Sequence, residues 1–254
     1  MSGKSAREAR REERLLAEGK DGRQERRKRL LQIASAAIFL AVVVVAVLIV
    51  VSNNGGSGGD TNLEDVGLVK QNLQGIPQSG LALGDAKAKV TLYEFGDLQC
   101  PVCKAFSEEI VPEVIDSKVR SGEAKIEFRN FTIISEQSVP AGAAAIAAGR
   151  QGRGWNYIEL FYRNQGEEAS GYVTDEFMTE IARGAGVPDI AKWDKERKET
   201  KTTEEVEATT AEAERLSFTG TPSFAVEGPA TSGKETLGTP GEAGLLEEAI
   251  EEAA

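Results

Sequence analysis

The most informative stretch of the chain, residues 95–106, reads Phe95-Gly96-Asp97-Leu98-Gln99-Cys100-Pro101-Val102-Cys103-Lys104-Ala105-Phe106. It contains both cysteines of the 254-residue sequence and follows a strand-like run at residues 89–95. Two cysteines at positions i and i+3 of a first helical turn lie on one face, about 5 to 6 Å apart, which is the Cα separation that a disulfide needs. The spacing therefore predicts one reversible disulfide, Cys100–Cys103, that opens and closes without moving the fold.

Two other interpretations of the cysteine pair are weaker. A bridge that closes a ring of four residues removes only about 2 kcal/mol of unfolded-chain entropy, so a purely structural disulfide is not favoured. A closed zinc site needs four nitrogen or sulfur ligands, and the chain has no histidine and no further cysteine. We therefore expect no metal, and no cofactor other than the redox-active disulfide itself.

The N-terminal part of the sequence predicts a membrane anchor. Residues 1–29 carry 11 basic and six acidic side chains, a net charge of +5, and residues 30–51 contain no charge at all. As a helix these 22 residues are about 33 Å long, enough to span a hydrocarbon core of about 30 Å. The basic cluster at residues 26–29 keeps the N-terminus in the cytoplasm and places the rest of the chain outside. A cleaved signal peptide is the alternative, but its apolar region is shorter, about 7 to 15 residues.

The chain beyond the anchor divides into a linker and one domain. Residues 52–80 begin as a Gly/Ser-rich coil and end in a turn, so the folded part is tethered close to the membrane. Residues 81–254 are enough for one domain with a sizeable core. Because the chain carries a net charge of −11 despite its basic start, this domain is strongly acidic. Nucleic acid is therefore not an expected partner, since phosphate binding needs clustered Lys and Arg.

The pattern within residues 81–254 predicts the α/β class. A first strand region begins at residue 81, a buried strand at residues 90–95 leads into a helix over residues 101–117, and residues 125–131 alternate with the period of a second strand. Pro101 suits the first helical turn, where its missing N–H has no partner in any case. A strand, helix, strand unit of this kind has a right-handed crossover.

A helical segment separates this unit from the C-terminal strands. Residues 138–217 have helical periodicity, with helices expected at residues 140–152, 155–164, 175–185 and 189–216. Strands return at residues 218–226 and 234–237. The spacing Thr239-Pro240-Gly241-Glu242 predicts a capping box and a final helix. Pro222, at a Gly-Thr-Pro step, is a candidate cis residue because the cis form of an X-Pro bond costs only about 0.5 to 1 kcal/mol.

These motifs together resemble the DsbA-like thioredoxin-fold oxidoreductases, particularly the membrane-anchored extracytoplasmic members found in bacteria. The resemblance covers roughly residues 83–253. It rests on the order of four parts: residues 83–85 with the first strand, residues 94–103 with the cysteines, the helical insertion, and residues 220–224 followed by two strands and a helix. It implies a thioredoxin fold with an inserted helical subdomain at about residues 138–217, preceded by the transmembrane helix.

The resemblance also implies roles for individual residues. Cys100 is expected to be an exposed nucleophile, Cys103 the resolving thiol, and Pro222 a cis residue facing the cysteine pair. Glu94 falls where the family often carries a buried acid that helps to move the proton of the resolving thiol. Asp97 is the competing candidate for that role.

Contacts to a client are expected next to the cysteines. An extended client segment could align beside the backbone of Thr221 and add a short strand, as other peptide binders do. Pro101 and Val102, between the cysteines, complete the expected substrate-binding residues. The expected clients are secreted or membrane proteins that contain cysteines, and the resemblance further implies a membrane redox partner that regenerates the disulfide.

The dipeptide between the cysteines departs from the family's strongly oxidising type, which has Pro-His there. This chain has Pro101-Val102 and no histidine. Cys100 then depends on the helix N-terminus to favour its thiolate, since the nearby Lys104 need not point at the sulfur. A stabilised thiolate makes the disulfide a better oxidant, so we expect an oxidant.

Two other functions stay open at this point. The first is the opposite electron flow, in which the protein is a membrane-tethered reductant of one extracytoplasmic client. The second is a non-catalytic, thioredoxin-like binding or chaperone module in which the cysteines only stabilise the fold. Replacement of both cysteines by serine would leave the second function intact.

Overall fold

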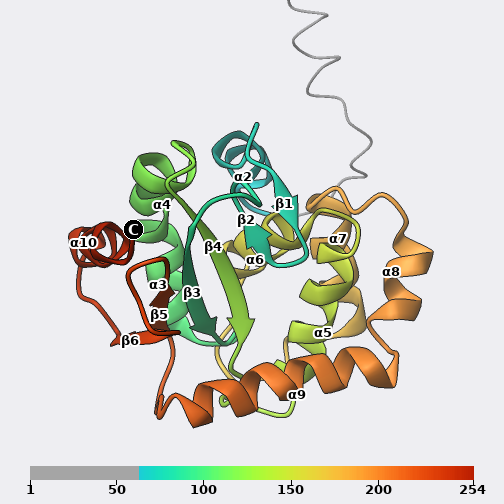
Figure 1. Ribbon diagram of the computed structural model, residues 1–254. Coiled ribbons are helices and arrows are strands. Elements are labelled where there is room, and N and C mark those ends of the chain that lie inside the picture. The colour runs from blue at the N-terminus through green and yellow to red at the C-terminus, as the bar shows by residue number, and fades with distance from the viewer. Residues whose placement is uncertain (1–62) are drawn as a thin grey trace, which may run out of the picture. The chain divides into compact units, whose positions relative to one another are not determined.

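The computed structural model of the protein describes residues 63–254 (Figure 1). The expected basic segment (residues 1–29), the transmembrane helix (residues 30–51) and the first part of the linker lie outside the described residues. Within the described range, no helix is both long and apolar enough to cross a membrane.

A six-stranded mixed sheet forms the centre of the domain, in the order β1-β2-β4-β3-β5-β6. Its strands are β1 Gln78–Ser79, β2 Ala82–Leu83, β3 Val90–Gly96, β4 Ala124–Asn130, β5 Ser223–Glu227 and β6 Glu235–Gly238. The central pair β3 and β4 is parallel, and every other neighbouring pair is antiparallel. Since β3 and β4 run parallel in register, their carboxyl ends meet at one edge of the sheet, where β3 leads into the cysteine pair.

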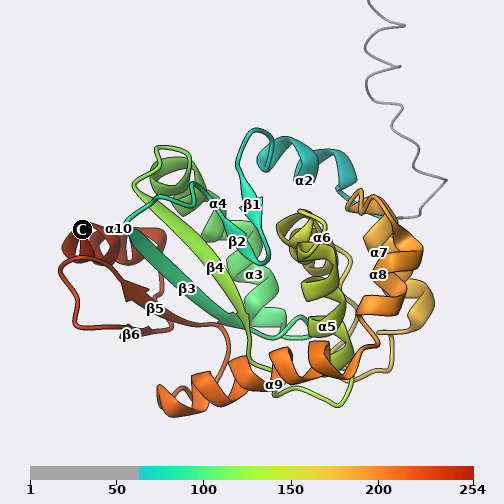
Figure 2. The same cartoon turned by 45° about the vertical axis from the view of Figure 1, so that its right-hand side comes forward.

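Helices cover both faces of the sheet and form the insertion. They are α2 Val66–Asn72, α3 Pro101–Glu109, α4 Val111–Val114, α5 Ser138–Gly149, α6 Gly154–Arg163, α7 Asp175–Gly184, α8 Ile190–Glu196, α9 Thr200–Arg215 and α10 Ala243–Ala253, with a π-helical turn at Ile115–Val119. Figures 1 and 2 show α5 to α8 gathered beside the sheet and α9 running along its lower edge back toward β5. The expected α/β fold with a helical insertion is confirmed.

The two faces of β3 bury different cores because successive side chains on a strand point to opposite sides. On one face, α3 packs against the sheet, and the ring of Phe106 on α3 lies 5.9 Å from that of Phe224 on the neighbouring strand β5. On the other face, Phe95 lies 5.2 Å from Phe218 and packs in the same cluster as Ala213 of α9. All seven residues of β3 are buried, so the strand that leads to the cysteines is held rigidly from both sides.

The helix expected over residues 101–117 is interrupted. Helix α3 ends at Glu109 and α4 begins at Val111. Pro112 explains the break, because proline has no N–H to continue the ladder and its ring clashes with the carbonyl four residues earlier.

The helix expected over residues 189–216 is two helices, α8 and α9. Their junction is Glu199, which has an extended backbone with ψ 136°. The Thr202 hydroxyl donates to the carbonyl of Glu196 at 2.7 Å, and this bond takes the acceptor that a continuing helix would use.

The capping box expected at residues 239–242 is wrong. Helix α10 starts at Ala243, and Glu242 is its N-cap residue without a side-chain capping bond. The Thr239 hydroxyl instead donates to the carbonyl of Pro222 at 2.6 Å, and so ties the end of β6 to the proline loop.

Strand β5 is shorter than expected, since it begins at Ser223 and not at Phe218. The folded domain also begins earlier than the expected boundary at residue 81. Helix α2 buries Val69, and strands β1 and β2 form a hairpin joined to β4.

Candidate active site

Cys100 is the N-cap residue of α3, at the point where the chain leaves the sheet edge. Its backbone N–H donates to the carbonyl of Asp97 at 2.9 Å. Its sulfur accepts a hydrogen bond from the N–H of Cys103 at 3.5 Å, as a capping side chain does. The sequence folds this way because Pro101 at the first helical position starts the helix directly after Cys100.

Cys100 is not the exposed residue that was expected. Only 4 % of its surface is accessible, and Cys103 is fully buried. The reason is the capping geometry, which turns the sulfur toward the helix start and toward the carbonyl of Thr221, 3.4 Å away. The next residue but one, Val102, is 49 % exposed. The Cys100 sulfur therefore lies just beneath an apolar surface, with a small opening to solvent.

The two thiols have opposite proton affinities. A hydrogen bond from the Cys103 thiol is the main cause that lowers the pKa of Cys100 to about 6. Burial opposes it, while the Thr221 side chain and the N–H groups of Cys103 and Val102 lower the pKa further. Burial, followed by the hydrogen bond with Cys100, raises the pKa of Cys103 well above its usual value. Cys100 is thus the thiolate at neutral pH and Cys103 is the protonated partner.

The proline loop completes the outer wall of the site. The Thr221–Pro222 peptide bond is cis, as expected for a candidate at this step. Its carbonyl faces the Cys100 sulfur, and proline presents no N–H that would compete for a partner at that point. The fold therefore brings Thr221 and Pro222 next to Cys100, although Thr221 lies 121 positions further along the sequence.

Glu94 lies on β3 beneath the cysteines. It is 2 % exposed, and among the described residues its Oε1 atom has no hydrogen-bond partner. Burial, with a smaller contribution from the charge of Glu159, raises the pKa of Glu94 to about 8. Since the Glu94 charge also raises the pKa of Cys103, the two groups are close enough to influence each other's protonation.

Asp97, the competing candidate for proton transfer, is fully buried but saturated with hydrogen bonds. One oxygen accepts from the N–H of Gln99 at 2.9 Å, and the other accepts from the N–H groups of Ile133 and Ile134 at 2.8 and 2.9 Å. These bonds join the ends of β3 and β4. Asp97 shapes the loop that presents Cys100, and the geometry favours Glu94 for the proton role.

Lys104 is not among the described groups that lower the pKa of Cys100. Its ammonium lies 3.9 Å from Glu108, one helical turn further along α3. The low proton affinity of Cys100 thus comes from the helix start and from Cys103.

Sequence reasoning missed the contribution of the insertion. The Tyr162 hydroxyl donates to the carbonyl of Asp97 at 3.3 Å, the same carbonyl that accepts the Cys100 N–H. The Gln165 amide donates to the carbonyls of Leu98 and Cys100 at 2.8 and 3.1 Å. Both come from α6 or the residues just after it, 59 or more positions after the cysteines, and no local signal distinguishes them from ordinary core or surface residues.

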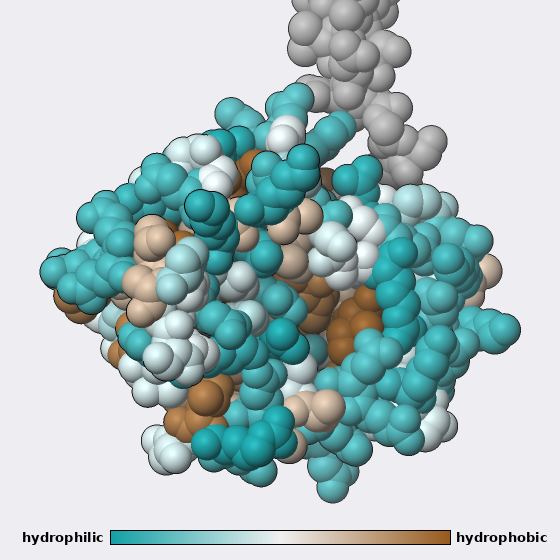
Figure 3. All heavy atoms as spheres, in the orientation of Figure 1, coloured by the Kyte–Doolittle hydropathy of each residue, from teal (hydrophilic) through white to brown (hydrophobic). Residues whose placement is uncertain are grey.

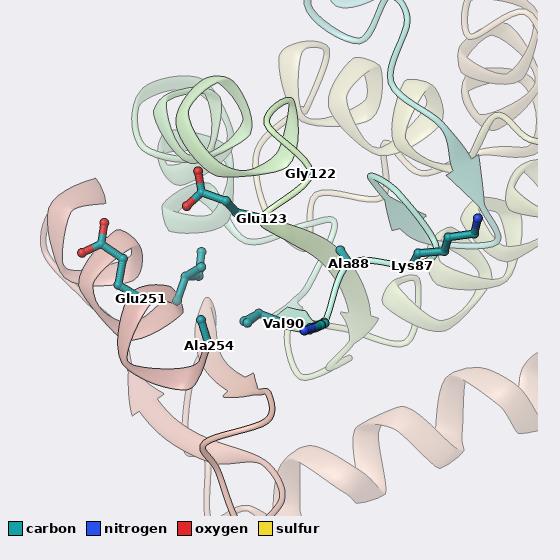
Figure 4. A pocket seen from close by; sticks show the side chains of 9 residues that line it. Lys87, Ala88, Val90, Gly122, Glu123, Glu251 and Ala254 are labelled. Atoms are coloured by element: carbon teal, nitrogen blue, oxygen red, sulfur yellow. The ribbon is translucent and has the colours of Figure 1, made fainter.

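Two cavities in the described part of the chain lie away from the cysteines. One of about 520 Å³ is at the amino ends of β3 and β4, next to Val90, Glu123 and the C-terminal Ala254 (Figure 4). Another, of about 360 Å³, opens between β4 and helices α5 and α9, on a largely hydrophilic face whose hollow has an apolar floor (Figure 3). Neither of these two cavities is lined by Cys100 or Cys103.

Comparison with known proteins gives consistent results. Residues 78–240 match the sequence model of the family described as Thioredoxin. The chain is 26 % identical over 151 residues to the probable disulfide bond formation protein D of Bacillus cereus, covering 58 % of this chain and 69 % of that protein. Its fold is similar to that of oxidised BdbD from Bacillus subtilis, with a TM-score of 0.60, 21 % identity, and coverage of 70 % of this chain and 97 % of that chain. Wolbachia pipientis alpha-DsbA1 gives a TM-score of 0.59 at 17 % identity, covering 68 % and 89 %.

Proposed function

We propose that this chain, which belongs to the thioredoxin family and is a DsbA-like thiol-disulfide oxidoreductase, acts as an oxidant that donates the Cys100–Cys103 disulfide to secreted or membrane proteins. The observation that carries the proposed direction is the low pKa of Cys100, about 6. A thiolate that is stabilised in the reduced protein makes the disulfide easier to reduce, and hence a stronger oxidant.

The exchange proceeds in two displacements that conserve electrons. A client thiolate attacks the Cys100 sulfur, the Cys100–Cys103 bond breaks, and Cys103 leaves as a thiolate that takes up a proton. A second client thiolate then attacks the client sulfur of this mixed disulfide, and Cys100 leaves as its stabilised thiolate. The client gains one disulfide, and the two electrons stay on Cys100 and Cys103. Cys100 suits the second step because a thiol of low pKa is a good leaving group.

Client contacts follow from the two sides of the opening. The Thr221 carbonyl and the adjoining Pro222 offer an extended client segment a place to align, in the manner of strand addition. Val102, at 49 % exposed, offers an apolar contact on the other side. Because strand addition needs an extended client backbone, these contacts suit unfolded or loosely folded segments more than the surface of a compact protein.

The proposed location is the outer face of the cell membrane. The uncharged residues 30–51, preceded by a basic cluster, would hold the domain there. A tether of this kind raises the effective concentration of any redox partner in the same membrane. Regeneration of the disulfide by such a membrane partner is part of the proposal. The name of the Bacillus cereus relative, a disulfide bond formation protein, supports the same direction of transfer.

Trapping of clients tests this function. In Cys103→Ser the Cys100 thiolate can still attack a disulfide of an exported protein and release one client thiolate, which is the second displacement in reverse. Cys103 is then missing to break the mixed disulfide, so covalent complexes with exported cysteine-containing proteins should accumulate and disappear on treatment with a thiol reductant. The matched control is Cys100→Ser, which should trap nothing because Cys103 is fully buried. If Cys103→Ser is produced at normal levels yet traps no client, exchange with protein thiols is not the function of this chain.

A further inference from the structure

A third buried carboxyl, Glu159, lies in the core below the cysteines and has no part in the exchange described so far. It is 5 % exposed and belongs to α6 of the insertion. A buried carboxyl is costly unless it is paired or neutral. Its position next to the redox centre therefore calls for an explanation beyond packing.

The backbone geometry places Glu159 opposite Glu94. A methyl group built on Gly96 would lie 3.0 Å from the Tyr162 hydroxyl, so this face of β3 meets this face of α6. Residues 94 and 96 point to the same side of a strand, and residues 159 and 162 to the same side of a helix. Glu94 and Glu159 thus face each other across the layer between sheet and insertion.

Helix α3 brings Cys103 to the same place. The Ser107 hydroxyl donates to Oε1 of Glu159 at 2.9 Å, and Ser107 follows Cys103 by one helical turn on the same face of α3. Figure 2 shows α3 and α6 next to each other on this side of the sheet. Glu159, Glu94 and Cys103 therefore share one buried compartment built from three elements.

The remaining charged neighbours of Glu159 only partly neutralise it. Arg163 lies 3.7 Å from its other oxygen, Oε2, but Arg163 also pairs with Asp65 at 3.3 Å. Glu108 on α3 adds a like charge, and burial remains the largest influence, so that the pKa of Glu159 is raised to about 7. Within residues 63–254 no cation pairs with Glu94, and one of its oxygens has no hydrogen-bond partner there.

We propose that Glu159 is a positioning residue for proton exchange at Cys103, acting through Glu94. The inference rests on the proposed function, because it concerns regeneration of the disulfide, the step in which Cys103 loses a proton as it attacks a mixed disulfide on Cys100. In that step Cys103 gives its proton to the Glu94 carboxylate, its sulfur bonds to Cys100, and the departing thiolate carries the electron pair away. A like charge at Glu159 increases the proton affinity of Glu94 and so brings this acid closer to the thiol that it serves.

The direct test is a titration of Glu94 in the reduced, purified chain. Carbon-13 labelling of glutamate carboxyls allows each pKa to be followed by NMR, and Glu94→Gln identifies the Glu94 signal by its loss. In Glu159→Gln the pKa of Glu94 should fall by about one unit, because a like charge has been removed. Glu159→Asp, which keeps the charge, should restore most of the original value.

The functional readout is disulfide closure after reaction with oxidised glutathione, where Cys103 expels glutathione from Cys100. The acid limb of its pH–rate profile should move to lower pH in Glu159→Gln by the same amount as the Glu94 titration. In a Glu94→Gln background, Glu159→Gln should leave that limb unmoved. Ser107→Ala is a further control, since it removes a neutral neighbour of Glu159 and should shift the profile less.

Two failures can be told apart. If the unmodified chain forms no disulfide from glutathione at any pH, the proposed exchange itself is contradicted. If the unmodified chain closes normally but Glu159→Gln changes only the melting temperature and leaves the Glu94 titration and the profile in place, Glu159 is a structural partner of Arg163 and this inference is overturned.

Discussion

A single sulfur atom carries two tasks in this protein, because Cys100 is both the N-cap of α3 and the reacting thiol. As a helix cap, the sulfur accepts a hydrogen bond from the N–H of Cys103. It also accepts a hydrogen bond from the Cys103 thiol. A side chain that receives hydrogen bonds as an anion loses its proton more easily. The same local geometry therefore starts helix α3 and makes the Cys100 thiol reactive.

The hydrogen bond from the Cys103 thiol is the largest influence that lowers the pKa of Cys100, and this can be tested. In Cys103→Ala the pKa of Cys100 should rise above about 6, because the strongest hydrogen bond to its thiolate is lost. In Cys103→Ser the hydroxyl replaces that donor, so the pKa should stay closer to the original. Thiolate absorbance near 240 nm, followed against pH, measures both. Equal values for the two variants would show that the helix start alone sets the proton affinity.

At the scale of elements, the two buried carboxyls at the end of β3, Glu94 and Asp97, should differ in how much they contribute to stability. Asp97→Asn should lower the free energy of unfolding by about 2 to 4 kcal/mol, because an amide cannot accept all the backbone N–H bonds that the carboxylate accepts. Glu94→Gln is the matched control. Because the pKa of Glu94 is about 8, most of this carboxyl is protonated at pH 7, and one oxygen has no partner among the described residues, so its change should stay within about 1 kcal/mol.

Urea unfolding at pH 7 measures both variants. A loss for Glu94→Gln as large as that for Asp97→Asn would contradict the assignment of Asp97 to loop structure and of Glu94 to proton exchange. A small loss for Asp97→Asn would show that its backbone bonds contribute little.

Local sequence signals predicted the elements that carry their own pattern. The apolar run before Cys100, Pro101 at a helix start and the Gly-Thr-Pro step before Pro222 each depend on neighbouring residues, and each lies where it was expected. The breaks at Pro112 and Glu199 were missed because amphipathic periodicity continues across them. Thr239 was misassigned because its partner, the Pro222 carbonyl, is 17 positions away.

The parts of the site that sequence could not predict are those that depend on tertiary contact. The burial of Cys100 comes from the fold that brings Thr221 against it. Tyr162 bonds to the Asp97 carbonyl and Glu159 bonds to Ser107 of α3, both from the insertion, and their spacing on α6 matches that of any buried helix face. A single sequence shows no pairing between such distant segments, so only the three-dimensional structure identifies them.

For the whole molecule, the thiolate of Cys100 links redox state to stability. Its pKa of about 6 in the folded, reduced protein is below the value of about 8.5 for a free thiol. The resulting stabilisation of the reduced form is fully present above about pH 8.5 and is lost as the pH falls through about 6. At neutral pH the reduced protein keeps part of this stabilisation, and the disulfide form is therefore more easily reduced.

The equilibrium reduction potential of the purified chain against glutathione at pH 7 tests this account most directly. The pKa of Cys100, about 6, lies between about 7 for thioredoxin and about 3.5 for DsbA, so the account predicts a potential above about −270 mV, the thioredoxin value, and below about −120 mV, the DsbA value. A potential at or below about −270 mV would contradict the account, since it would mean that the reduced form is not favoured and that electrons flow from this protein to its clients.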